Sequence, residues 1–334
     1  MFHGYAANEA GAALAPLEFD PGPLRDDDIE IRVEYCGICH SDLSMLNNEW
    51  GMTAYPFVPG HEIVGIVDRV GPLVRNLRVG QRVGVGWYTR ACMTCPACIS
   101  GNQNLCSASE QTIVSRHGGF SDRVRAHHSW AIPLPDTIEP RTAGPLFCGG
   151  ITVFGPIIEQ QVRPIDRVGV IGVGGLGHMA VRFLRSWGCE VTAFSSSPNK
   201  EREVRELGAH HFVSSKDTKR LQDLRGYFDF IISTVNVPMD WGTFIDLLAP
   251  KGHLHLVGAV LDPIPVQVFS LLMGNKSIGA SPLGTPTQVT KMLDFTARHQ
   301  IAPIVEVFKL SDVNKAFDHL KAGKARYRLV LDCS

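Results

Sequence analysis

The 334-residue sequence lacks an excess of charge of either sign and lacks an apolar run long enough to cross a bilayer. Its 32 Lys and Arg residues balance 33 Asp and Glu residues, so composition gives no support to a general nucleic-acid binder. The most apolar stretch, residues 254–273, is interrupted by a histidine, an aspartate and two prolines. No Lys or Arg precedes Arg25, and the beginning carries no apolar signal core. We therefore expect a soluble, cytoplasmic protein without a membrane or nucleic-acid partner.

The sequence also lacks the evenly paired cysteines of a disulfide framework. Its nine cysteines include four within fifteen positions: Cys92, Cys95, Cys98 and Cys106. An odd number without a secretion signal favours metal binding or a reactive thiol. Four thiolates so close together can surround one Zn²⁺ and leave no open position, which predicts a structural zinc site. Unbound loop cysteines and an iron–sulfur cluster are weaker alternatives, because the last spacing does not match the ferredoxin pattern.

Two stretches of the chain differ in their hydrophobic pattern, and the length suggests two domains. The first, up to about residue 150, carries short apolar runs bounded by glycines. We expect strands at 30–34, 63–70 and 82–86, in a mostly β domain. The second alternates strand-like and helix-like segments, which predicts an α/β domain with a parallel sheet and right-handed crossovers. Its expected strands are 167–171, 190–194, 228–233, 253–257 and 277–280, and its expected helices are 178–187 and 200–207.

The end of the chain is expected to return to the first domain. After about residue 285 the pattern predicts helices near 287–299 and 311–321 and a last strand at 327–331. We therefore predict one domain from residues 1–150 with 285–334, and a second from residues 151–284.

A glycine-rich motif lies directly between the strand 167–171 and the helix that follows. It reads Gly172-Val173-Gly174-Gly175-Leu176-Gly177. In this position the first glycine forms the turn, the second lets the backbone approach a pyrophosphate, and the third allows close packing of helix and strand. The motif predicts a dinucleotide at the helix N-terminus in a Rossmann-type doubly wound sheet. A purely structural glycine turn is the alternative.

Three further segments carry residues able to bind a metal. They are CGICHSD at 36–42, PGHE at 59–62 and CGG at 148–150. Taken singly, each histidine or cysteine is more often a packing residue than a ligand. Cys36 and Cys39 would also suit a redox pair, but no thioredoxin-like sequence surrounds them.

Together these segments resemble a known family. The stretch GHEIVGIVDRVGPLV at 60–74 is similar to the signature of zinc-dependent alcohol dehydrogenases of the medium-chain dehydrogenase/reductase superfamily. CGICHSD, the four-cysteine loop, FCGGITVF and GVGGLG follow in the order of that family, over almost the whole chain. The cinnamyl alcohol dehydrogenase branch resembles it most. The resemblance implies a mostly β GroES-like catalytic domain beside the Rossmann domain, and hydride transfer between nicotinamide and primary alcohols or aldehydes.

The resemblance also implies roles for individual residues. Cys39, His61 and Cys148 would hold a catalytic zinc, with Glu62 as an alternative ligand to water and Asp42 orienting a ligand. Zn²⁺ suits this reaction because it polarises a carbonyl oxygen and makes a bound alcohol acidic.

A relay would carry the alcohol proton outward through the hydroxyl of Ser41. Many relatives have a histidine three residues later, where this sequence has Ser44. The outer end of the relay is therefore left to His40, to water or to the ribose. A second departure is the short segment between Cys106 and Gly118, which leaves the shape of the substrate channel open.

The cofactor preference is predicted from the end of the second strand. NAD-specific domains place Asp or Glu about 20 residues after the first glycine, whereas residues 194–200 of this chain, FSSSPNK, contain no acidic residue. Three hydroxyls and an ammonium suit the 2′-phosphate of NADP(H), which the resemblance also implies. The predicted cofactor-binding residues are Thr152, Gly172, Gly174, Gly175, Leu176, Gly177, Ser195, Ser196, Ser197, Lys200, Thr234, Gly258, Ser281 and Leu283.

The substrate is indicated only by aromatic residues near the ligand segments. Trp50, Tyr55 and Trp87 would suit aromatic or allylic aldehydes, or would simply fill the β core. A polyol or amino-alcohol dehydrogenase of the same superfamily, and a non-catalytic zinc and dinucleotide protein, are the alternatives. The family implies a homodimer or homotetramer.

Overall fold

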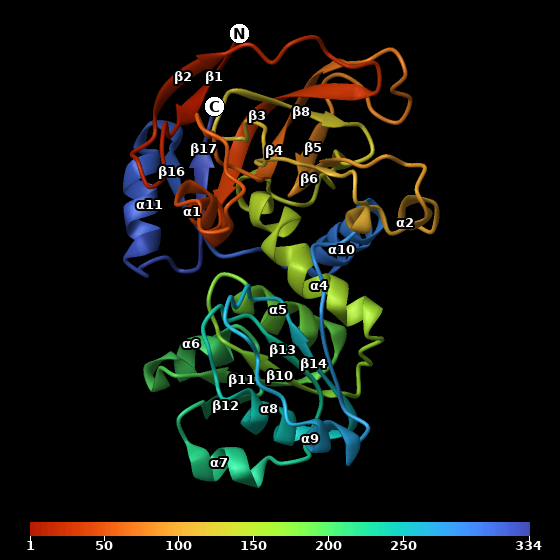
Figure 1. Cartoon of the computed structure of the whole chain (residues 1–334), viewed down its shortest axis with the longest axis vertical. Helices are drawn as coiled ribbons and strands as arrows, with labels where there is room; N and C mark the ends of the chain where they lie inside the picture. The colour runs from red at the N-terminus through yellow and green to blue at the C-terminus, as the bar shows by residue number, and fades with distance from the viewer. The chain divides into compact units, whose positions relative to one another are not determined.

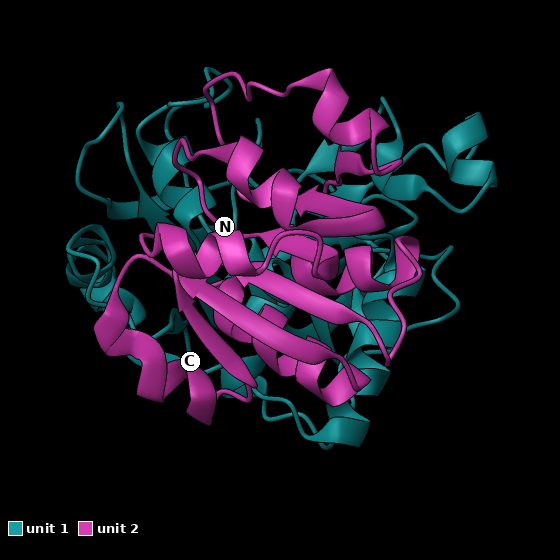
Figure 2. Ribbon diagram, turned by 90° about the horizontal axis from the view of Figure 1, so that it is seen from below, with its two compact units in different colours: residues 1–151, 283–334 teal, residues 152–282 magenta.

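The computed structural model describes all residues, 1–334, and the chain forms two compact units. The first contains Met1–Ile151 and Leu283–Ser334, and the second contains Thr152–Pro282 (Figure 2). These limits differ by one or two residues from the domain limits expected from the sequence. After the roles that the sequence predicts for them, we call the first unit the catalytic unit and the second the dinucleotide unit.

The catalytic unit is built on a seven-stranded sheet. Strand order is β16-β17-β3-β4-β5-β9, and β8 pairs with β3. Smaller two-stranded sheets are formed by β1 with β2 and by β6 with β7. Both ends of the chain belong to this unit (Figure 1). Its strands are β1 (Phe2–Ala6), β2 (Ala15–Phe19), β3 (Asp28–Ile38), β4 (Glu62–Val70), β5 (Arg82–Val85), β6 (Tyr88–Arg90), β7 (Glu110–Gln111), β8 (Arg123–His127), β9 (Ile132–Pro133), β16 (Val305–Lys309) and β17 (Arg328–Asp332).

Short helices connect these strands, and apolar side chains fill the space between them. Ile29, Ile31 and Val33 alternate along β3 and are fully buried, as the period of a strand requires. They join one core cluster with Phe57 and Phe120. The helices of the unit are α1 (His40–Leu46), α2 (Pro96–Ile99), α3 (Pro140–Ala143), α10 (Pro286–His299) and α11 (Val313–Lys321), and α4 (Gly149–Glu159) continues into the dinucleotide unit.

The last strand, β17, returns to the first domain, as the sequence predicts. β17 is antiparallel to β3, with Leu329 opposite Ile38 and Leu331 opposite Cys36. Its side chains are buried from Arg328 to Leu331. The final residues are therefore an internal part of the sheet that carries Cys39.

The dinucleotide unit has a six-stranded, entirely parallel sheet with order β12-β11-β10-β13-β14-β15. Figure 2 shows these strands as one twisted layer between helices. The arrangement confirms the predicted α/β class. The strands are β10 (Arg167–Ile171), β11 (Glu190–Ser195), β12 (His211–Ser214), β13 (Phe228–Ser233), β14 (Leu248–Leu256) and β15 (Ser277–Ala280), and the helices are α5 (Gly177–Trp187), α6 (Glu201–Glu206), α7 (Thr218–Asp223), α8 (Trp241–Leu247) and α9 (Val268–Leu272).

The structure corrects some predicted limits. β14 begins at Leu248, five residues before the predicted start, because the turn-forming Pro250 and Gly252 lie inside the strand at an irregularity of its register with β13. α6 begins at Glu201 rather than residue 200, because Lys200 ends a 3₁₀ turn opened by Pro198. The strand β12 has no counterpart among the predictions.

No single helix of the chain is long and apolar enough to span a bilayer. Only one bent helical pair, Pro140–Phe147 with Gly149–Glu159 at 55°, meets the criterion of length and composition jointly.

Candidate functional site

Four side chains of the ligand type converge in the catalytic unit. The donor atoms of Cys39, His61, Glu62 and Cys148 all lie within 4.8 Å of one another, and all four residues are buried. Cys39 Sγ is 3.9 Å from Cys148 Sγ, which is 3.3 Å from His61 Nε2. The fold thus assembles, from three distant segments, the set that the family resemblance implies.

The carboxylate of Asp42 fixes two of these residues, Cys39 and His61, by hydrogen bonds. Its Oδ1 is 2.9 Å from His61 Nδ1 and accepts the backbone N–H of Gly60, also at 2.9 Å. Its Oδ2 accepts the backbone N–H of Cys39 at 2.8 Å. Because Asp42 takes the Nδ1 side of the ring, the lone pair of Nε2 is directed toward the two sulfur atoms.

Arg328, which sequence reasoning missed, forms a buried ion pair with Glu62 through its Nη2 and the Oε1 of Glu62. The other carboxylate oxygen, Oε2, is buried and has no hydrogen-bond partner. Burial raises the pKa of Glu62 to about 7, although the charge of Arg328 opposes the shift. The backbone makes room for this carboxylate, because a Cβ at Gly37 would overlap the Glu62 side chain.

The chemistry of the set fits zinc. The hydrogen bond from Cys148, together with the charge of Arg328, lowers the pKa of Cys39 well below its ordinary value despite burial. Two sulfur donors and an imidazole are a recognised catalytic zinc set, and the unpaired Oε2 of Glu62 is a fourth donor in the same space. Cys39, His61 and Cys148 would hold the metal here, leaving one position for Glu62, water or substrate.

The three residues considered for the proton relay, Ser41, His40 and Ser44, have different surroundings in the structure. Ser41 Oγ lies 3.7 Å from the sulfur of Cys39. His40, the first residue of α1, is exposed. Ser44 is 4% exposed and forms a hydrogen bond with Glu49, which contributes to the lowered pKa of that carboxylate. Ser41 is therefore adjacent to Cys39 of the candidate metal cluster, whereas the hydroxyl of Ser44 is engaged with Glu49.

The four-cysteine loop forms a second cluster between β6 and β7. The sulfur atoms of Cys92, Cys95, Cys98 and Cys106 lie within 4.8 Å of one another. The backbone N–H of Cys95 donates to Cys92 Sγ at 3.3 Å, and the N–H of Cys92 to Cys106 Sγ at 3.5 Å. Hydrogen bonds from Thr94 and Cys95 lower the pKa of Cys92 to about 6. Four sulfurs without an open position match a structural zinc site.

The glycine loop of the dinucleotide unit has the predicted geometry. Gly172 has a φ of +84°, which favours glycine, and a Cβ at Gly177 would overlap the carbonyl of Gly172. A Cβ at Gly174 would meet nothing within 4 Å, so the loop is open there to a ligand. Lys200 Nζ donates to the carbonyl of Val173 at 3.0 Å and thus lies beside the loop.

Most of the other predicted cofactor residues follow the carboxyl ends of parallel strands, where open α/β sheets bind ligands. Leu283 departs from this pattern, since it belongs to the catalytic unit and its carbonyl accepts a hydrogen bond from Asn104 Nδ2 at 2.7 Å. Thr152 is buried within α4. The residues at the carboxyl edge are Gly172 after β10, Ser195 at the end of β11, Thr234 after β13, Gly258 after β14 and Ser281 after β15.

An aromatic ring lies against His61, one of the candidate metal ligands. The ring of Trp87 meets His61 edge-on at 5.1 Å, and Trp50 meets Trp87 at 6.0 Å. Tyr55 differs, because its hydroxyl donates to the carbonyl of Leu46 and its ring contacts Phe57. Of the three predicted aromatic residues, Trp87 thus adjoins the candidate metal cluster, Trp50 contacts Trp87, and Tyr55 takes part in the packing of the core.

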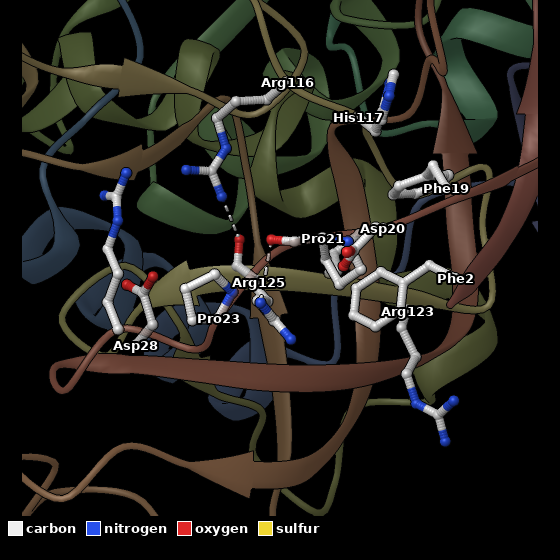
Figure 3. A pocket seen from close by; sticks show the side chains of 12 residues that line it. Phe2, Phe19, Asp20, Pro21, Pro23, Asp28, Arg116, His117, Arg123 and Arg125 are labelled. Atoms are coloured by element: carbon white, nitrogen blue, oxygen red, sulfur yellow. Dashed lines mark hydrogen bonds between the residues drawn. The ribbon is translucent and has the colours of Figure 1, made fainter.

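A separate cavity of about 270 Å³ lies in the catalytic unit and contains none of the predicted site residues (Figure 3). Its guanidinium groups are already engaged. Figure 3 shows Arg116 directed at the backbone carbonyl of Arg125, a contact of 2.8 Å. Arg25 and Arg116 pair with Glu110, and Arg125 pairs with Glu30. We assign no catalytic role to this cavity.

Family models match both units. The model described as "Alcohol dehydrogenase GroES-like domain" matches residues 25–136, and that described as "Zinc-binding dehydrogenase" matches residues 175–298. Among curated relatives, the aldehyde reductase AdhA of Synechocystis sp. is 54% identical over 334 residues, covering 100% of this chain and 99% of the relative. A probable mannitol dehydrogenase of Medicago sativa is 39% identical and covers 98% and 94%.

Solved structures agree with this assignment. A cinnamyl alcohol dehydrogenase from Sorghum bicolor superposes with a TM-score of 0.95 at 36% identity, covering 99% of this chain and 97% of the other. A CAD from Helicobacter pylori, solved in complex with NADP(H), gives a TM-score of 0.91 at 30% identity, with the same coverage. These matches confirm the predicted pairing of a GroES-like and a Rossmann domain.

Proposed function

Because the chain belongs to the alcohol dehydrogenases of the medium-chain dehydrogenase/reductase superfamily, we propose that it uses zinc and NADP(H) to interconvert primary aromatic or allylic alcohols and their aldehydes. The observation that carries the proposal is the buried cluster of Cys39, His61 and Cys148, with Asp42 bound to the outer ring nitrogen of His61. A structural protein has no need of such a set with one position left open.

When bound, zinc supplies a Lewis acid for the substrate oxygen, and NADP(H) supplies or accepts the hydride. The chain positions the reactants and moves the proton. Asp42 fixes the ring of His61, and Arg328 fixes one oxygen of Glu62 so that the other stays available. In this proposal the Ser41 hydroxyl, next to Cys39, takes the proton of the substrate alcohol and passes it outward.

The preference for NADP(H) is supported by the end of β11. Ser195 Oγ accepts the backbone N–H of Ser197 at 3.2 Å, so the turn is held by hydroxyl groups rather than by a carboxylate. The ammonium of Lys200 lies beside the glycine loop through its contact with Val173. Positive charge and hydroxyl donors at this place suit a 2′-phosphate. The Helicobacter pylori relative was solved with NADP(H).

The aromatic or allylic class of substrate is supported by the ring of Trp87 beside His61 and by that of Trp50 against Trp87. Flat apolar rings favour a flat apolar substrate over a hydrated polyol. A polyol dehydrogenase is the second candidate, because one curated relative is named a probable mannitol dehydrogenase.

We also propose that the protein is a homodimer or homotetramer. The outer edge of β15 has no strand partner, and α9, which closely precedes it, carries exposed apolar side chains. Val268, Phe269, Leu272 and Met273 are 64%, 74%, 65% and 82% exposed. An open strand edge beside apolar side chains suits pairing with a second copy around a twofold axis. Light scattering on the purified protein tests this, and a monomer at micromolar concentration contradicts it.

The activity is tested with a matched panel of substrates and cofactors. Cinnamaldehyde, benzaldehyde and the sugar aldehyde mannose are offered with NADPH and with NADH, and kcat/KM is compared. We expect the highest kcat/KM for the two flat aldehydes with NADPH. Trp87→Ala should lower kcat/KM for the flat aldehydes only. A preference for the sugar substrate supports the polyol alternative, and the absence of turnover with every pair contradicts an oxidoreductase of this kind.

A further inference from the structure

A continuous chain of side-chain hydrogen bonds crosses one face of the dinucleotide unit at β14 and β15. Ser277 Oγ is 2.7 Å from His253 Nδ1. His253 Nε2 is 3.1 Å from His255 Nδ1, and His255 Nε2 is 2.9 Å from Ser281 Oγ. Ser277 begins β15, and Ser281 directly follows its carboxyl end. The chain therefore leads along the strand to the edge of the sheet where ligands bind.

The surrounding backbone and packing are shaped for the two imidazoles. His253 and His255 are two residues apart on β14 and so share one face. The neighbouring strand has Gly279 opposite His255, and a Cβ at Gly279 would come within 3.0 Å of the ring of His253. Phe230 on β13 stacks against His253 with centroids 6.0 Å apart and planes at 13°. The rings are thus held in place on both sides.

Both rings are neutral near pH 7. Burial, with a smaller effect of His253, lowers the pKa of His255 to about 4, and burial also lowers the pKa of His253. A neutral imidazole has one N–H donor and one acceptor nitrogen, so the chain must run in a single direction. If the proton of each ring is on Nε2, the more stable position in a free imidazole, His255 donates to Ser281 Oγ. The Ser281 hydroxyl then keeps its own proton for another acceptor.

We propose that Ser277, His253 and His255 act as a positioning relay that fixes the hydroxyl of Ser281 as a hydrogen-bond donor to the bound dinucleotide. The acceptor is an oxygen atom of the ligand at the carboxyl edge, such as a carboxamide or ribose oxygen. The inference rests on the proposed function, because it takes the edge beside Ser281 as the cofactor site. It adds three residues that do not touch the cofactor but determine the orientation of one that does.

The test compares two amides at position 255. The amide of His255→Gln reaches the place of Nε2 and keeps a partner for Ser281, whereas that of His255→Asn reaches only the place of Nδ1. Dissociation constants for NADPH and NADH are measured by fluorescence titration of each purified variant. We expect His255→Asn to weaken dinucleotide binding about three- to tenfold, the usual size of one hydrogen bond, and His255→Gln to stay within about twofold of wild type. The control is His211→Asn, which changes an exposed histidine on β12 paired with Glu190.

A double-mutant cycle separates positioning from a structural effect. If His255 acts through Ser281, His255→Asn has no further effect on binding in a Ser281→Ala background. An equal loss in both backgrounds, or wild-type affinity of His255→Asn, overturns the relay. Ser277→Ala, at an exposed position where folding is not at risk, should also weaken binding, and an unchanged affinity contradicts a relay of all four residues.

The tautomer provides a readout independent of binding. In ¹⁵N-histidine-labelled protein, the relay requires a proton on Nε2 and none on Nδ1 of both rings. A proton on Nδ1 of His255 overturns the proposed direction.

If wild type binds NADH rather than NADPH, the cofactor proposal fails but the relay is still tested with NADH. If it binds neither, both proposals are overturned.

Discussion

The carboxylate of Asp42 lies 2.9 Å from Nδ1 of His61, and both side chains are completely buried. The charge of Asp42 raises the pKa of His61 well above its ordinary value, although burial alone would lower it. Such a partner makes the ring a stronger donor toward a metal and holds its orientation.

Asp42→Asn should therefore weaken zinc binding at this site about 10- to 100-fold and lower kcat in proportion to the zinc lost. Part of the loss arises because the amide nitrogen of Asn would face the backbone N–H of Cys39 or Gly60. Zinc affinity is measured by competition with a chelator. Asp68→Asn, a half-exposed carboxylate in the same unit, is the control. Wild-type zinc affinity in Asp42→Asn would show that the contact is only structural.

Two zinc ions per chain are expected, and each should respond to a different substitution. Cys148→Ala should remove one zinc and abolish turnover while leaving the thermal midpoint near that of wild type. Cys98→Ala should remove the other zinc and lower the thermal midpoint, because binding at the closed site contributes directly to folding. Cys189→Ala, at a buried cysteine whose thiol donates to the Arg163 carbonyl, should keep both zinc ions. Elemental analysis with no more than one zinc in fully active protein would refute the two-site assignment.

Ser41→Ala should depress kcat far more than Ser44→Ala, by about tenfold or more, because the hydroxyl of Ser41 adjoins Cys39, a proposed zinc ligand. Ser44 is engaged with Glu49, so its loss should affect stability rather than proton transfer. Rates are compared where a deuterated alcohol shows that hydride transfer is limiting. Equal rates for wild type and Ser41→Ala under that condition would exclude Ser41 from the relay.

Ser195→Asp should shift cofactor preference toward NADH. A carboxylate about 4 Å from a phosphate charge costs up to about 4 kcal/mol at an effective dielectric near 20, less after screening by salt. Since each 1.4 kcal/mol is tenfold, we expect a shift of about 10- to 100-fold in the ratio of kcat/KM values. Lys200→Met should reduce the use of NADPH selectively, whereas Lys219→Met on α7 should not. An unchanged ratio in Ser195→Asp would show that this turn does not contact the 2′-phosphate.

Acid should destabilise the dinucleotide unit partly through His255. The pKa of this ring is about 4 in the folded protein against 6.5 ordinarily. As the pH falls from about 6.5 to 4, the unfolded chain takes up a proton that the folded chain does not, so stability falls over that window. The thermal midpoint of His255→Gln, which lacks this titration, should therefore drop less across the window than that of wild type. Parallel pH profiles for the two proteins would contradict the buried, neutral ring.

Elements with a strong local pattern were predictable from the sequence. The strands Arg167–Ile171 and Phe228–Ser233 have the predicted limits, because apolar runs bounded by polar or glycine residues define buried parallel strands. The edge strand Ser277–Ala280 also has its predicted limits, although its residues are exposed or half-buried. The four-residue strand β12 was not predictable. Only two apolar residues lie between His211 and Ser214, which are too few to show the alternation of a strand. It forms because its backbone pairs in parallel with β11, and this contact depends on the tertiary structure.

Some residues of the candidate site were predictable from the sequence, and others were not. The resemblance supplied the ligand set of Cys39, His61 and Cys148 because family motifs lie around each ligand. Arg328 has no such motif, and its partner Glu62 is 266 positions away. Only the pairing of β17 with β3 brings the arginine to the carboxylate. The relay through His253 was hidden similarly, since the register of β14 with β15 decides that Ser277 and Gly279 face the two rings.

The position of β17 inside the sheet also sets an order for biosynthesis. The dinucleotide unit is encoded by one continuous segment, Thr152–Pro282, and can close as soon as that segment has left the ribosome. The catalytic unit cannot, because the strand that pairs with β3, and Arg328 that pairs with Glu62, are translated after the whole dinucleotide unit. Until β17 has been translated, the thiols of Cys39 and Cys148 belong to an incomplete sheet. A premature stop codon between Pro282 and Arg328 would therefore disable the proposed metal centre while sparing the dinucleotide fold.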